Sequence, residues 1–252
     1  MKISKIVTLA LTPVLLAGCG AKSMSRADAL KKLEGMAEHD YSKDIENVKK
    51  LSVVQTTEVK GTGTGDGKLA MTIAFDLENA VMYESDVYEG AASAALGAGG
   101  ETWTFVKENQ LIMAQRSAGA NIGTYQSAPL TEETAAQYAV LLASNVARFY
   151  GNAVELIGTV AETIEALNAS ESVMDSFEES YVDKGEGAMS VKVVGKKGTE
   201  SATFEAEISN YIVTKISESM AAEGATETTT MDFKVGEASY SLPDITNWTP
   251  AN

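Results

Sequence analysis

A single thiol is the side chain in this sequence with the most distinctive chemistry, and its neighbours indicate what that chemistry is. Cys19 is the only cysteine, and the three residues before it, at positions 16–18, are Leu-Ala-Gly. A thiolate is the nucleophile that alkylation on sulfur requires. The small residues at 17 and 18 suit the narrow cleft of a peptidase. These residue types suit alkylation of the thiol and cleavage of the chain beside it.

The segment before Cys19 has the charge and length of an export signal. Lys2 and Lys5 give it a positive start, and an apolar run follows at positions 6–16. A run of that length is too short to cross a ~30 Å hydrocarbon core as a helix. It matches the hydrophobic region of a secretory signal peptide.

Residues 16–19, Leu-Ala-Gly-Cys, resemble the lipobox of bacterial lipoproteins at every position. The resemblance implies that Cys19 receives a diacylglyceryl thioether, that cleavage follows Gly18, and that Cys19 becomes the mature N-terminus. We expect a signal peptide over 1–18 and a lipidated tether over 19–25. The lipid would hold an extracytoplasmic protein on the bacterial cell membrane, which in a Gram-negative cell can be the outer membrane. The alternative is a secretory signal beside an incidental cysteine.

Side chains that carry enzymatic chemistry are sparse. A Ser-His-Asp or Cys-His site needs an imidazole, and the one histidine, His39, stands beside Asp40 at the polar end of a predicted helix, where we expect it to cap that helix. The glycine-rich run 61–68 fails as a phosphate loop because position 62 is Thr and position 69 is Leu. We predict no enzyme, no catalytic residue, no metal site and no cofactor.

The charge balance argues against a nucleic-acid partner. The chain has 20 basic and 35 acidic residues, a formal net charge of −15, and removal of residues 1–18 takes away two lysines and no acid, which makes it −17. The phosphate backbone would repel such a protein. A chain of this length buries enough surface to fold without disulfides. A protein partner is not identified by the sequence.

Two segments have apolar positions at helical spacing. The first runs from about residue 26 to 38, with Ser25 as its N-terminal cap. The second covers residues 131–168, and Thr131 can cap its start. As one rod the second would measure ~57 Å, whereas a compact domain of this size has a diameter of ~45 Å. We therefore expect a break or bend near Gly151-Asn152 that gives two helices, and a further short helix over 171–181.

Elsewhere apolar and polar residues alternate. The pattern is clearest at 69–77, 202–208 and 231–235, with further strands expected at 81–83, 103–107, 111–115, 189–193 and 211–217. Alternation means that one face is buried and one solvated, which is typical of an antiparallel sheet. The predicted fold class is α+β: one curved antiparallel sheet with helices on one face, in a single domain over 26–252.

The order of these elements resembles that of a known lipoprotein group. A lipobox, a helix, a strand meander, central helices and a second meander also make up the half-barrel lipoproteins grouped around the bacterial lipoprotein carrier LolA and the mycobacterial LppX type. Residue-level similarity is confined to the terminal Leu-Pro-Asp at 242–244 and to the Trp-Thr-Phe-Val strand at 103–106, followed by Asn109. The resemblance implies a half-barrel sheet wrapped around helices, with an apolar cavity for acyl chains.

These expectations lead to a candidate binding site and two functions. The side chains expected to face one another across the cavity are Met71, Ile73, Phe75, Phe204, Ile208, Met231 and Phe233 from the sheet, and Leu142, Val146, Phe149 and Leu156 from the helices. The predicted function is a membrane-anchored lipoprotein that binds a hydrophobic ligand, such as lipid or acyl chains, between sheet and helices. The alternative is a surface interaction protein with a solid core, which contacts another protein and binds no small ligand. A transporter's solute-binding subunit is a weaker third option.

Overall fold

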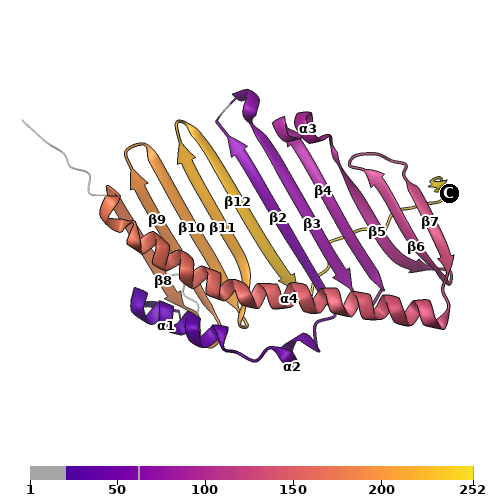
Figure 1. The fold of residues 1–252 in the computed structure, drawn as a ribbon, viewed down its shortest axis with the longest axis horizontal. Helices are drawn as coiled ribbons and strands as arrows, with labels where there is room; N and C mark the ends of the chain where they lie inside the picture. The colour runs from indigo at the N-terminus through magenta and orange to yellow at the C-terminus, as the bar shows by residue number, and fades with distance from the viewer. Residues whose placement is uncertain (1–20, 62, 252) are drawn as a thin grey trace, which may run out of the picture.

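The computed structural model describes residues 21–61 and 63–251. Within them the fold is mixed α and β: one large open sheet of thirteen strands and one long helix (Figure 1). The signal peptide predicted over 1–18 and the predicted lipidation site Cys19 lie outside the described residues.

Two antiparallel meanders lie side by side in the sheet. The first consists of β2 (Lys50–Lys60), β3 (Gly67–Asp76), β4 (Val81–Gly90), β5 (Gly99–Lys107), β6 (Gln110–Ser117) and β7 (Thr124–Pro129). The second consists of β8 (Ser176–Asp183), β9 (Met189–Lys197), β10 (Glu200–Ser209), β11 (Ile212–Ala222) and β12 (Ala225–Val235). They join where β12 pairs with β2. The predicted antiparallel sheet and its alternating strands are thus confirmed.

Short strands complete both edges of the sheet. β1 (Lys22–Met24) pairs antiparallel with β8, and β13 (Thr249–Pro250) pairs with β7 in the one parallel contact among the described strands. The edges are therefore occupied by the two ends of the described chain.

One continuous helix, α4 (Glu132–Ala169), connects the two meanders and crosses the strands (Figure 1). It starts after β7 and must reach β8, and the sheet order places eleven strands from one to the other. Ten gaps of ~4.8 Å amount to ~48 Å, which a helix of 38 residues, ~57 Å long, can cross. The predicted break near Gly151-Asn152 is therefore wrong, because the sheet is wider than a compact domain of this length.

The remaining helices are shorter. α1 (Arg26–Ala37) is the predicted first helix, and the Ser25 side chain accepts a hydrogen bond from the backbone N–H of Asp28 at its start. α2 (Ser42–Ile45) and α3 (Ala91–Leu96) are single turns or little more.

The short helix predicted over 171–181 is wrong. Residues Glu171–Val173 form one 3-10 turn, and the strand β8 follows it. Phe177 and Tyr181 are four positions apart, a spacing that places two side chains on one side of a helix and equally on one face of a strand. Pairing with β9 along the whole of β8 decides in favour of the strand.

The core consists of three clusters. One lies between α1, the C-terminal half of α4 and β8–β10, and includes Leu33 and Ile157. A second lies between the N-terminal half of α4 and the centre of the sheet, and includes Leu142 and Phe75. The third, around Trp103, lies on the face turned away from α4, since successive strand residues point to opposite faces.

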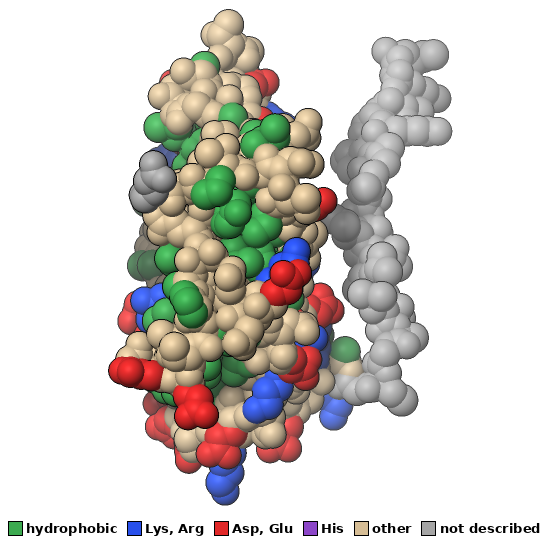
Figure 2. Space-filling view, turned by 90° about the vertical axis from the view of Figure 1, so that its right-hand side faces the viewer, with side chains coloured by type: hydrophobic (Ala, Val, Ile, Leu, Met, Phe, Trp, Pro, Cys, Tyr) green, Lys and Arg blue, Asp and Glu red, His purple; other side chains and the backbone are tan. Residues whose placement is uncertain are grey.

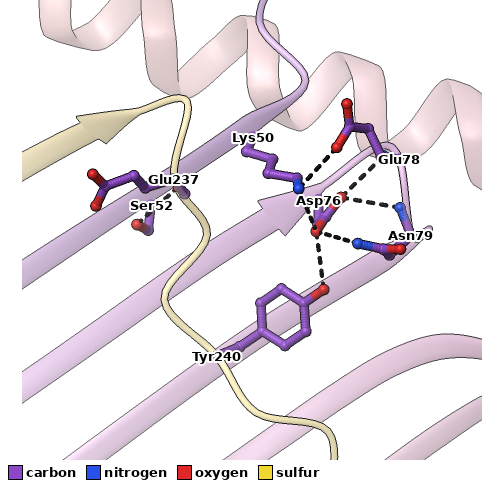
Figure 3. A network of polar contacts seen from close by, with 7 residues as sticks. All are labelled: Lys50, Ser52, Asp76, Glu78, Asn79, Glu237 and Tyr240. Atoms are coloured by element: carbon purple, nitrogen blue, oxygen red, sulfur yellow. Dashed lines mark hydrogen bonds and ion pairs between the residues drawn. The ribbon is translucent and has the colours of Figure 1, made fainter.

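The chain after β12 covers this third cluster. The indole N–H of Trp103 donates to the Ser241 carbonyl at 3.0 Å, and its ring meets that of Trp248 edge-on at 5.9 Å. A polar network around Asp76 fixes Tyr240 on the same face (Figure 3). The first meander therefore packs against α4 on one face and against the C-terminal segment on the other.

Candidate functional site

An apolar groove lies between the middle of α4 and strands β12, β2 and β3. Its volume is about 390 Å³, within the range of small-ligand sites. The strands contribute Val53, Gln55, Met71, Ile73, Met231 and Phe233, and the helix contributes Phe149, Asn152, Glu155, Leu156 and Thr159.

The floor of the groove consists of two rows of directly opposed strand residues. Phe233, Val53 and Ile73 form one row across three strands, and Met231, Gln55 and Met71 form the next. Directly opposed side chains project from the same face of a sheet. The register of the junction between the two meanders thus brings together residues from three distant parts of the sequence.

The two rows differ in exposure. Phe233 is 5% exposed and Val53 9%, whereas Met71 is 36% exposed. The first row therefore lies deep, close to α4, and the second opens towards solvent. Phe149, Asn152, Leu156 and Thr159 recur at intervals of three and four, so they line one side of α4 above this floor.

The structure brings six of the eleven predicted cavity residues to this groove. The six are Met71, Ile73, Phe149, Leu156, Met231 and Phe233. The other five do not line it: Phe75, Leu142 and Val146 belong to the buried cluster beside the groove, and Phe204 and Ile208 to the cluster under the other half of α4. Each of them is at most 4% exposed.

The polar lining residues escaped the sequence reasoning. That reasoning sought apolar positions, whereas Gln55, Asn152, Glu155 and Thr159 are polar. A signal for the last three was present, because they follow Phe149 at helical spacing along the border of the apolar stripe. No comparable pattern indicated Gln55, whose place depends on strand pairing.

His39 has a packing role next to α1. Its backbone N–H donates to the Met36 carbonyl one residue beyond the helix C-cap, and its ring nitrogen Nε2 lies 2.8 Å from Oδ2 of Asp44. The imidazole also stacks on the ring of Tyr211 with centroids 3.8 Å apart. The side chain thus bonds to Asp44 of α2 and stacks on Tyr211 in the turn between β10 and β11, in place of the predicted cap.

Over 21–61 and 63–251, no three His, Cys, Asp or Glu side chains gather into a group that would hold a metal ion. No helix of that part of the chain is long and apolar enough to span a membrane.

No protein family matches this sequence, and no characterised protein is detectably similar to it.

Proposed function

We propose that this protein is a lipoprotein of the bacterial cell envelope, tethered by lipid on Cys19, which binds a hydrophobic ligand such as an acyl chain. The ligand lies in the groove between α4 and strands β12, β2 and β3. The sheet acts as a half-barrel around α4 and α1. The groove itself, about 390 Å³ with a mainly apolar lining, is the observation that carries this proposal.

The open second row of the floor is what a ligand would cover. Met71 and Met231 flank Gln55 there, and α4 does not bury them fully. Removal of apolar surface from water is worth ~25 cal/mol per Å², so an apolar chain laid on this row is stabilised. Methionine side chains are unbranched and flexible, which suits chains of varied shape.

The position of β1 supports the tether. Lys22 pairs with Asp183 and Met24 with Tyr181, so the chain is fixed to the β8 edge of the sheet almost at once after Cys19. Three residues span at most ~11 Å. A lipid on Cys19 would therefore hold the β1–β8 edge beside the membrane, with little free linker.

Mass spectrometry of organic extracts from the purified chain tests the binding function. We expect the wild-type protein to retain lipid, and Met71→Arg to lose it, because a charge would then stand on the groove floor. Met220→Arg is the matched control: Met220 is an exposed methionine on β11 that does not line the groove. Equal lipid content in all three proteins, or none in the wild type, would contradict the proposal.

A second candidate, a protein-contacting module, is favoured by exposed apolar side chains away from the groove. Val140 and Leu141 of α4 are 66% and 49% exposed. Hydrophobic side chains also gather on the end of the molecule that carries β7, where Met113 and Ile122 are exposed (Figure 2). Absence of lipid from the wild-type extract would favour this function.

A further inference from the structure

The groove has one charged lining residue, and it is an acid. Glu155 is the only ionisable side chain among the eleven lining residues, and it lies on the exposed side of α4. Within the described part of the chain its carboxylate has no hydrogen-bond or ion-pair partner. The groove thus presents one unpaired negative charge at the rim of its apolar floor.

Further carboxylates stand on both sides of this floor. On β4, Glu84 is directly opposite Ile73 and Asp86 is directly opposite Met71. On β11, Glu218 is opposite Thr229 of β12. Directly opposed residues share a face with their Cβ atoms ~4.5–5.5 Å apart, so Glu84 and Asp86 border the groove itself.

The lysines of the same strands lie on the other face. Strand register places Lys50 opposite Asp76, Lys68 opposite Glu58, Lys234 opposite Ser52 and Lys215 opposite Asp232. Each of these lysines, like Lys60, stands at a strand position that alternates with the groove-facing ones, so its side chain points to the opposite face. In β11, β12, β2, β3 and β4, as far as the structure describes them, the charges on the α4 side are therefore all negative.

One cation lies near the groove, and it is already engaged. The Arg148 guanidinium sits 4.9 Å from the centre of the Phe149 ring and donates to Oδ1 of Asn145 at 3.0 Å. Arg148 is not a lining residue. It precedes Glu155 by seven residues, which places it two turns, ~10.5 Å, along the same side of α4.

We infer that the groove selects amphiphiles with a positively charged head, an apolar chain that ends in an ammonium group. The chain lies on the methionine row and the ammonium group meets Glu155, while Glu84 and Asp86 add negative charge on the β4 side of the floor. A carboxylate or phosphate head in the same position meets only like charge. This inference rests on the proposed function for the apolar half of the site and adds the chemical class of the head.

The test compares three probes with one twelve-carbon chain: dodecylammonium, dodecanol and dodecanoate. Binding to the purified full chain is measured by calorimetry below the concentration at which the probes aggregate. We expect dodecylammonium to bind most tightly and dodecanoate most weakly, with about a fivefold step for each exposed ion pair gained or lost. The differences in affinity among the three probes should become smaller as added salt screens the exposed charges.

Two variants locate the effect. Glu155→Gln should weaken dodecylammonium about fivefold and leave dodecanol unchanged. Glu165→Gln removes the same charge from an exposed position of α4 outside the groove and should change neither. Both positions are exposed, so both variants are expected to fold.

The outcomes separate the two proposals. Dodecanoate or dodecanol binding as tightly as dodecylammonium would overturn the head-group inference and leave the apolar groove intact. A dodecylammonium preference that survives in Glu155→Gln at full strength would also overturn it, because the attraction would then come from the net charge of the whole protein. Binding of none of the three probes would overturn the proposed function itself.

Discussion

The hydroxyl of Tyr240 donates a 3.0 Å hydrogen bond to the carboxylate of Asp76, which lies 164 positions earlier in the sequence. Asp76 is 2% exposed, and it also accepts bonds from the backbone N–H groups of Glu78 and Asn79 and from the Asn79 side chain (Figure 3). Lys50 stands 3.7 Å away. This one carboxylate therefore ties the C-terminal segment to the β3–β4 turn.

This arrangement makes stability depend on pH. Burial alone would raise the pKa of Asp76, but the hydrogen bonds from Asn79 and Tyr240, together with the charge of Lys50, lower it below its usual value. A carboxyl with a lowered pKa in the folded state stabilises the protein above its unfolded pKa, ~3.9, and this contribution is lost as pH falls through the folded value. We expect wild-type unfolding free energy, from urea titration, to fall more steeply below pH ~4 than that of Asp76→Asn.

Tyr240→Phe serves as the control for that experiment. It keeps the carboxylate and removes one donor, so a reduced but still visible pH slope is expected. Equal slopes in the wild type and in Asp76→Asn would show that this carboxyl is not responsible for the acid sensitivity.

Two glycines test the continuity of α4. A Cβ at Gly151 would lie 3.5 Å from the Tyr41 hydroxyl, an ordinary contact, and one at Gly158 would meet nothing within 4 Å. Glycine inside a helix costs up to ~1 kcal/mol relative to alanine. We expect Gly151→Ala and Gly158→Ala each to raise the unfolding free energy by ~0.5–1 kcal/mol. A helix broken at Gly151 with a left-handed residue there would instead make Gly151→Ala destabilising.

Local patterns predicted the elements of this fold well, and long-range pairing decided the rest. Alternation at 202–208 was enough to identify β10, because the exposed and buried faces differ along a single strand. The length of α4 depends on how many strands it crosses. The spacing of Phe177 and Tyr181 fits a helix and a strand equally well. The groove floor depends on β12 meeting β2, which no local pattern specifies.

The anchor is tested at Cys19. Cys19→Ser removes the thiol that would be alkylated, so we expect either an unprocessed precursor or release from membranes. A diacylglyceryl group supplies two chains and binds membranes stably, so the wild-type protein should stay on membranes through a high-salt wash. Fractionation and intact-mass measurement check both points, with Ser23→Ala as a control in the same segment. Unchanged size and partitioning of Cys19→Ser would rule out lipidation.

Two phenylalanines distinguish the packed core from the groove wall. Phe204 is 4% exposed within the cluster under the C-terminal half of α4, so Phe204→Ala should cost ~3–5 kcal/mol of unfolding free energy. Phe149 is only partly buried, with its ring 5.3 Å from that of Phe75, and it lines the groove. Phe149→Ala should therefore cost less, roughly 1–2 kcal/mol, because part of the removed surface was already in water.

Ligand binding should respond in the opposite order: dodecylammonium affinity should fall in Phe149→Ala and stay near wild type in folded Phe204→Ala. Denaturant titration and calorimetry on the same two variants measure both quantities. Equal losses of affinity would mean that the groove is not a binding site distinct from the core.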